Sequence, residues 1–177
     1  MLSVVIASTG AASGLVATFA SLHEAATDGF VREVVVADPA ASVAVRAAAE
    51  DAGARVVEGP DAFGAACSAA RQPWLLLLKA GARLAVGWEP HAWRHINDHQ
   101  DQAGWFRLSL AGSGLAVRAA EARAALEARV LGRPRAEQGL LLPRRLYDIC
   151  IERGGRAELP IRPGRGALRP VGASLLA

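Results

Sequence analysis

Residues 74–78 read WLLLL, so every side chain in this stretch is apolar. A strand that is apolar on both faces is typical of a parallel sheet with helices packed on each side. Three earlier stretches are similarly short and rich in β-branched apolar residues. They are Ser3–Ala7 (SVVIA), Glu33–Ala37 (EVVVA) and Arg55–Glu58 (RVVE). We therefore predict four central strands in the first half of the chain.

Helical segments separate these strands. In the first, Leu15, Phe19 and Leu22 recur at helical spacing. The predicted helices are Ser13–Thr27, Ser42–Ala52 and Asp61–Arg71, and Asp61 is a suitable N-cap for the third. Strands that alternate with helices predict an α/β fold, Rossmann-like, with a mostly parallel central sheet and helices on both faces.

The second half is less regular. Helices are predicted at Pro90–His99, Leu115–Leu131 and Pro143–Arg153, and a strand at Trp105–Leu110. Residues 156–177 are rich in Gly, Pro and Arg, and no element is predicted there. Because no internal repeat and no linker divides the chain, residues 1–177 are expected to form a single domain.

Composition excludes several classes of protein. With 52% hydrophobic and 21% charged residues, the chain is not expected to be disordered. Lys79 is its only lysine, and the arginines are scattered rather than clustered, so no nucleic-acid partner is expected. No apolar run reaches the length of a transmembrane segment, and the N-terminal residues, which read as a first strand, are not expected to be a signal peptide. Cys67 and Cys150 are therefore expected to be reduced, in a cytoplasmic protein.

Two local motifs suggest other functions. Thr9–Val16 (TGAASGLV) partly matches the glycine-rich turn of NAD-dependent short-chain dehydrogenases, but Tyr147 has no lysine four residues later. His91, His95 and His99 lie at i, i+4 and i+8 of one helix, a span of about 12 Å that is too long for three ligands of one ion. We interpret the histidines as a solvated helix face and predict no metal site.

The order of the segments over most of the chain is more specific. REVVVADPAAS, GARVVEGPDAFGAACSAARQPWLLLLKAGARLAVGWE and PRAEQGLLLPRRLYDICIERGGRAELPI follow the first strand in turn. This sequence resembles the family-2 glycosyltransferases, in particular a bacterial subgroup with the GT-A fold, to about residue 161. The resemblance implies a nucleotide-binding half, 1–88, and a reduced acceptor half, 89–177.

The resemblance also implies roles for single residues. Ser8 and Thr9, in the loop after the first strand, would contact the nucleotide base. Asp38, after the second strand, would bind the uracil or ribose, and Gly64 would line the nucleotide pocket. The implied donor is a UDP- or GDP-sugar, and the implied reaction is glycosyl transfer to a hydroxyl acceptor.

The sequence departs from the family pattern at two places. Lys79-Ala80-Gly81-Ala82 stands where the family has its metal-binding carboxylates, so a divalent metal is not expected. Pro163 and Gly164 stand where the resemblance places the catalytic acids.

Two hypotheses follow from these departures. In the first, the Lys79 ammonium contacts the diphosphate directly, Glu137 is the catalytic base and Gln138 contacts the substrate. In the second, the domain has weak or no activity, as in a pseudoenzyme, and serves as a non-catalytic nucleotide-binding or scaffold domain. A protein partner or a homo-oligomer stays open in both.

Overall fold

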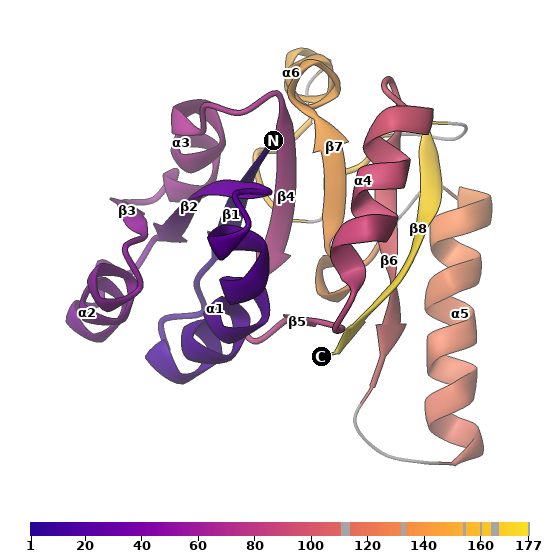
Figure 1. Ribbon diagram of the computed structural model, residues 1–177, viewed down its shortest axis with the longest axis horizontal. Coiled ribbons are helices and arrows are strands. Elements are labelled where there is room, and N and C mark those ends of the chain that lie inside the picture. Colours follow the sequence, from indigo (N-terminus) through magenta and orange to yellow (C-terminus); the bar gives the residue numbers. More distant parts are fainter. Residues whose placement is uncertain (111–113, 132–133, 154, 160, 164–166, 177) are drawn as a thin grey trace.

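The computed structural model describes residues 1–110, 114–131, 134–153, 155–159, 161–163 and 167–176. An eight-stranded sheet has the order β3-β2-β1-β4-β7-β6-β8-β5, with helices on both of its faces (Figure 1). The strands are β1 (Leu2–Ala7), β2 (Val31–Asp38), β3 (Arg55–Glu58), β4 (Trp74–Lys79), β5 (Arg83–Leu84), β6 (Ala103–Ser109), β7 (Leu140–Pro143) and β8 (Leu168–Leu176). The helices are α1 (Ala12–Thr27), α2 (Val43–Asp51), α3 (Ala62–Ala69), α4 (Trp88–Asp98), α5 (Leu115–Leu131), the short 3₁₀ helix η1 (Ala136–Gln138) and α6 (Arg144–Glu152).

The first four strands are parallel and form one half of the sheet. β1 lies in the centre of this half, between β2 and β4. Both neighbours end level with it, since Ala7 pairs with Ala37 on one side and with Lys79 on the other. This arrangement confirms the predicted parallel sheet and brings the carboxyl ends of three strands together.

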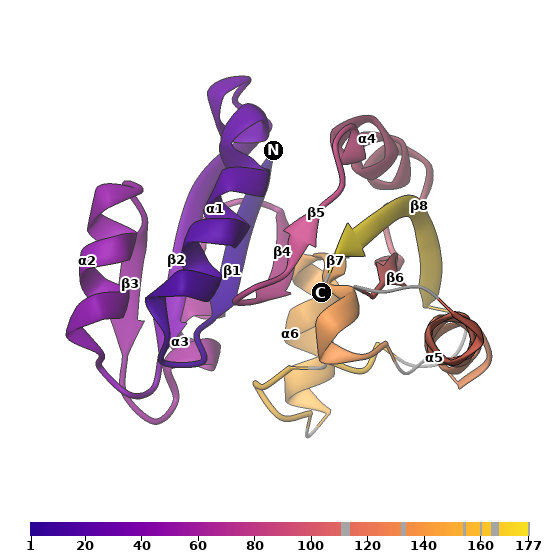
Figure 2. The ribbon, with the colours of Figure 1, turned by 90° about the horizontal axis from the view of Figure 1, so that it is seen from below.

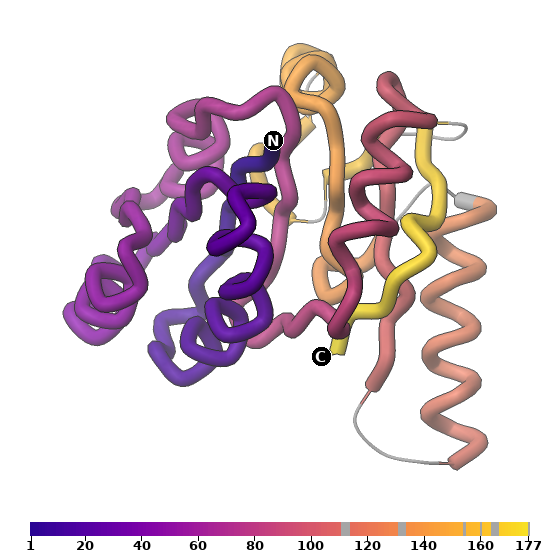
Figure 3. The backbone as a smooth tube through the Cα atoms, viewed as in Figure 1, coloured from indigo at the N-terminus to yellow at the C-terminus, as the bar shows by residue number. Residues whose placement is uncertain are grey.

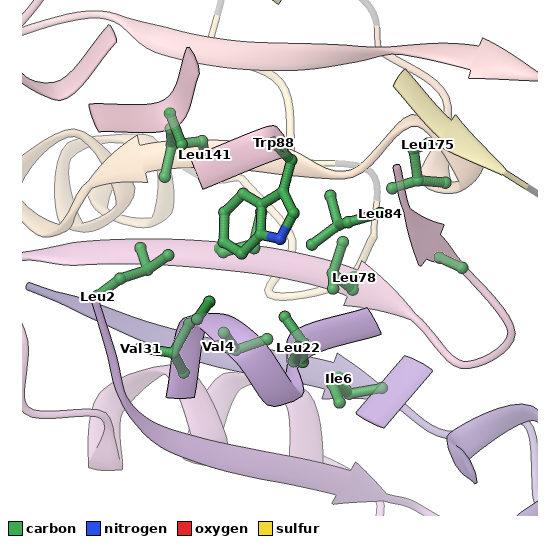
Figure 4. Close-up of a cluster of buried hydrophobic side chains, with 14 of the residues drawn as sticks. Leu2, Val4, Ile6, Leu22, Val31, Leu78, Leu84, Trp88, Leu141 and Leu175 are labelled. Carbon is green, nitrogen blue, oxygen red and sulfur yellow. The ribbon is translucent and has the colours of Figure 1, made fainter. Parts of the chain in front are cut away.

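Two apolar clusters hold the helices on opposite faces of the sheet. Leu2, Val4 and Ile6 of β1 pack with side chains of α1, α2 and α4, including the fully buried Trp88 (Figure 4). Val5, with buried side chains of β4, contacts α3 and α6 on the other face. Figure 2 shows α1 and α4 on one side of the sheet and α3 and α6 on the other. This alternation along β1 is the expected consequence of side chains pointing to opposite faces.

The second half of the sheet contains three strands that the prediction missed, the two-residue β5 and the longer β7 and β8. β7 pairs antiparallel with β4 and β6, and all four of its residues, Leu140–Pro143, are buried. β8 lies parallel to β6, so the end of the chain returns beside its middle (Figure 3). In β8 only Val171, Ala173 and Leu175 are buried, at every second position. Gly172, with a φ of 91°, lies where the register of β8 with β6 shifts.

Helix positions agree with the predictions to within one or two residues, but two side-chain predictions were wrong. The Asp61 side chain makes no capping hydrogen bond to α3. His95 is not solvated: it is 3% exposed, its Nε2 lies 3.1 Å from the Gln102 carbonyl oxygen, and its ring packs edge-on against Trp74. Burial lowers the pKa of His95, so the neutral imidazole is the form that the fold accommodates.

A polar network ties the amino ends of the strands together. The Glu33 carboxylate accepts hydrogen bonds from the Ser3 hydroxyl at 2.6 Å and from the Arg71 backbone N–H, and it pairs with Arg55 at 3.0 Å. Burial alone raises the pKa of Glu33, but these bonds to Ser3, Arg71 and Arg55 outweigh it and lower the pKa. Both cysteines are free, as predicted. No described helix combines the length and the apolar character needed to cross a membrane.

Candidate nucleotide cleft

A cleft of about 490 Å³ opens at the carboxyl ends of β1, β2 and β4. Two features explain this position. The three strands end at the same level, and strand order reverses at β1, because β2 and β3 lie to one side of it within the sheet and β4 lies to the other. Open α/β sheets bind ligands at such a reversal. The volume is in the range of small-molecule sites. The residues that line it are Ala7, Ser8, Thr9, Ala37, Pro39, Pro60, Asp61, Phe63, Gly64, Lys79, Ala136, Ala157, Glu158 and Leu159.

Four of the predicted nucleotide-binding residues meet in this cleft. Ser8, Thr9 and Lys79 come from the ends of β1 and β4, and Gly64 comes from the first turn of α3. The Ser8 hydroxyl accepts a hydrogen bond from the Gly10 backbone N–H at 2.9 Å, which fixes the loop after β1. A Cβ on Gly64 would lie 2.9 Å from that of Ala157, so the absence of a side chain lets segment 155–159 close this wall.

Lys79, which lines the cleft, forms an ion pair with Glu137, which is not among the lining residues. The Lys79 Nζ lies 3.3 Å from the Glu137 Oε1, and each side chain is 42% exposed. Lys79 is the last residue of β4 and Glu137 lies in η1, so 58 residues of sequence separate the two groups. The ammonium is the one positive side chain among the described lining residues, and a carboxylate already occupies one side of it.

Asp38 is close to the cleft but is not among its lining residues. Its side chain is fully buried, and Oδ2 accepts a hydrogen bond of 2.7 Å from the Ser42 backbone N–H. Oδ1 is also buried and has no partner among the described residues. In this arrangement Asp38 fixes the start of α2, and its predicted contact with a nucleotide stays a prediction.

Gln138 is likewise a buried residue. Its Oε1 accepts a hydrogen bond of 2.9 Å from the Arg135 backbone N–H, which closes the turn of η1. Its Nε2 is buried and lacks a partner within the described ranges. Gln138 does not line the cleft, so the structure gives it a role in the loop that presents Glu137, and its substrate contact stays a prediction.

The glycine-rich turn after β1 serves packing. A Cβ on Gly14 would lie 3.2 Å from the Gly81 backbone nitrogen, and the Gly81 N–H donates to the Gly14 carbonyl oxygen at 3.0 Å. The Thr18 hydroxyl accepts from the same N–H at 3.1 Å. The space that a dinucleotide would need beside Gly14 is thus filled by the loop after β4, which argues against the dehydrogenase hypothesis.

Sequence reasoning missed two acids in the cleft wall. Asp61 and Glu158 line it, and both are exposed. Asp61 was expected only as a helix cap. Glu158 lies in a segment without periodicity, where no pattern places it near β1. With Lys79 paired to Glu137, the cleft has no excess of positive charge.

Residues 79–82, at the end of β4, offer no side-chain ligand for a divalent metal. Metals of this kind prefer several oxygen ligands, but Lys79-Ala80-Gly81-Ala82 offers no side-chain oxygen where β4 ends. The ammonium of Lys79 at this point would repel a cation. Across the described residues, no three His, Cys, Asp or Glu side chains come together as a metal site. The expected catalytic position Pro163 is described, whereas Gly164 lies outside the described residues.

The chain matches no known protein-family profile and no curated protein sequence. Solved structures, in contrast, are similar over nearly its whole length. They include a mannosyltransferase from Pyrobaculum calidifontis in complex with GDP-Man and Mn²⁺ (TM-score 0.69, 15% identity, 99% of this chain and 56% of that one). TarS from S. aureus has a TM-score of 0.68 at 12% identity, over 100% of this chain and 60% of that one.

A third similar structure is glucosyl-3-phosphoglycerate synthase from Mycobacterium tuberculosis, in complex with Mn²⁺, UDP and glucosyl-3-phosphoglycerate. Its TM-score is 0.56 at 19% identity, over 82% of this chain and 57% of that one. The chain thus spans less than two thirds of the length of these structures. At such identities the similarity shows the fold alone. The order of strands, the helices on both faces and these similarities together establish that the chain has the GT-A fold of the glycosyltransferases.

Proposed function

We propose that the cleft binds a nucleoside diphosphate sugar, UDP- or GDP-linked, and that the domain transfers the sugar to a hydroxyl acceptor without a bound metal ion. The observation that carries the proposal is the position of Lys79. It places an ammonium at the carboxyl end of β4, inside a cleft of nucleotide size. The similar structures hold GDP-Man or UDP, which supports this class of donor.

Binding requires a change of partner at Lys79. In the structure the Lys79 ammonium lies 3.3 Å from the Glu137 carboxylate. A diphosphate carries more negative charge than this carboxylate, so it competes with Glu137 for the ammonium. Once displaced, Glu137 has a free carboxylate next to Ala136 of the cleft wall. An exposed ion pair is weak, about 0.2–1 kcal/mol, so the exchange costs little.

Glu137 then accepts the acceptor's proton. The acceptor oxygen forms a bond to the anomeric carbon, and the bond between that carbon and the phosphate oxygen breaks. The electron pair leaves with the nucleoside diphosphate, whose new charge the Lys79 ammonium stabilises. The hydroxyl proton passes to the Glu137 carboxylate.

One feature favours a second candidate, a nucleotide-binding domain without activity. Asp61 and Glu158 line the cleft, while Lys79 is neutralised by Glu137. This balance of charge weakens diphosphate binding and supports weak or lost transfer. The same domain would then bind a nucleotide and act as a scaffold.

Calorimetry with UDP and GDP in the presence of EDTA tests the first proposal. Metal-free binding that Lys79→Ala weakens supports it, and binding of neither nucleotide contradicts it. Release of UDP or GDP from the corresponding sugar nucleotide separates the candidates. Turnover that is lost in Glu137→Gln supports transfer, whereas binding without turnover supports the inactive domain.

A further inference from the structure

Helix α5 has its small residues turned inward and its large apolar residues turned outward. Ala124 and Ala128 are fully buried, and α5 contacts β6 and β8. Leu115, Leu126 and Val130, in contrast, are 85%, 61% and 53% exposed. A surface helix normally has the reverse arrangement, with its apolar stripe toward the core.

The exposed residues form a continuous stripe. At 100° per residue, positions 115, 119, 122, 126 and 130 fall on one side of the helix, opposite Ala124. Ala119 and Ala122, both exposed, fill the stripe between the larger side chains. We call this set, Leu115, Ala119, Ala122, Leu126 and Val130, the outer stripe. Figures 1 and 2 show α5 at the edge of the molecule farthest from α2.

The charges beside the outer stripe are positive. Arg118 and Arg129 are exposed along one flank, and neither has an ion pair or side-chain hydrogen bond within the described part of the chain. Both acids of the helix are engaged elsewhere. The Glu121 carboxylate accepts from the Leu110 backbone N–H at 2.8 Å, and Glu127 pairs with Arg123 and with Arg135 of the following loop. The surface that complements this helix is therefore apolar and anionic.

A second copy of the chain does not meet that requirement. In a parallel two-fold pair of α5 helices, the flank with Arg118 and Arg129 would meet the opposite flank, where Glu127 is already paired with Arg123 and Arg135. In an antiparallel two-fold pair, the same flank of each helix meets its own copy. Arg118 and Arg129 would then face the arginines of the other copy, and like charges repel. An acidic protein would need a groove shaped to this convex ridge. A bilayer surface needs no matching shape, because acyl chains adapt to side chains and lipid phosphates bind arginine.

We infer that α5 is a membrane-contact helix that lies flat on an anionic lipid surface. The outer stripe enters the acyl boundary, and Arg118 and Arg129 contact lipid phosphates. The helix is about 25 Å long, so this contact is extended but shallow. It involves only three large apolar side chains, which makes the binding reversible. The inference is independent of the function proposed for the cleft.

Co-sedimentation with vesicles tests the inference. The parent chain is expected to bind vesicles of phosphatidylcholine mixed with phosphatidylglycerol, to bind less at higher salt, and not to bind phosphatidylcholine alone. Leu126→Asp is expected to weaken binding at least tenfold. Val43→Asp, at a 77% exposed site on α2, is the matched control and is expected to bind like the parent.

Three results would overturn the inference. One is equal vesicle binding by Leu126→Asp and the parent, with thermal unfolding showing both folded. Another is the absence of binding to anionic vesicles, which would leave an acidic protein as the partner. The third is a dimer of the parent in light scattering that Leu126→Asp converts to a monomer, which would assign the outer stripe to a second copy.

Discussion

Replacing Lys79 and Glu137 singly should change nucleotide affinity in opposite directions. The two groups are 3.3 Å apart, and the diphosphate of the proposed donor must take the place of the carboxylate. Lys79→Ala removes the ammonium that the diphosphate needs. Glu137→Gln keeps the size of the side chain and removes its competing charge. We therefore expect UDP to bind more weakly to the first variant and more tightly to the second.

The magnitude follows from the exposure of the pair. Two unit charges about 4 Å apart interact by roughly 1–4 kcal/mol between effective dielectric constants of about 80 and 20. Because the Lys79 side chain is 42% exposed, the lower part of this range applies. Loss of about 1–2 kcal/mol weakens binding roughly 5- to 30-fold. The exposed ion pair is worth about 0.2–1 kcal/mol, so Glu137→Gln should tighten UDP binding by about 1.5- to 5-fold.

Calorimetric titration with UDP, at low ionic strength and with EDTA, measures both effects. Arg83→Ala is the matched control, since Arg83 is an exposed cation in β5, which follows β4 in the chain, and does not line the cleft. If Lys79→Ala binds UDP like the parent, the ammonium does not contact the diphosphate. If Glu137→Gln binds more weakly than the parent, the carboxylate contributes to the site instead of competing with the ligand. Either outcome refutes the exchange of partners.

Further predictions concern the stability of the fold. Glu33→Ala should lower the free energy of unfolding by about 1–3 kcal/mol in urea titrations, because the buried Ser3 hydroxyl loses its acceptor. The pKa of Glu33 is lowered from 4.5 in the folded state, so its contribution to the free energy of unfolding is complete above pH 4.5 and disappears as the pH falls through the folded pKa. Glu33→Gln should lose this pH dependence. Because the pKa of His95 is lowered in the folded state, the unfolded chain binds a proton at this residue more readily below about pH 6.5. The free energy of unfolding should therefore decrease as the pH falls below that value, by up to about 1.4 kcal/mol per pH unit. An unchanged slope in His95→Gln would contradict this assignment. Gly14→Val should cost about 1–3 kcal/mol in thermal unfolding because its Cβ would press on the Gly81 backbone, and wild-type stability would show that the loop can move.

The site was predictable where it depended on strand ends. Ser8, Thr9 and Lys79 follow or end strands that the apolar patterns identify, and parallel strands bring such residues to one edge of a sheet. Asp38 obeys the same rule, but its carboxylate turns into the protein to bind the Ser42 backbone N–H. The position of a residue in the sequence fixes where its backbone leaves the strand. The direction of its side chain depends instead on the hydrogen-bond donors nearby, such as the Ser42 N–H that binds the Asp38 carboxylate.

Local patterns in the sequence determined the parallel half of the fold. WLLLL and SVVIA are apolar on both faces, and segments of that kind are stable only between two layers of helices. The tertiary structure decided what those patterns do not encode. Long-range pairing made strands of β7 and β8, and the return of residues 155–159 across α3 closed the cleft. Contacts with Trp74 and with the Gln102 carbonyl oxygen buried His95, and the fold brought Glu137 to Lys79, which lies 58 positions earlier in the sequence. Contacts between residues far apart in sequence have no local signature, because their energy exists only once the rest of the sheet is in place.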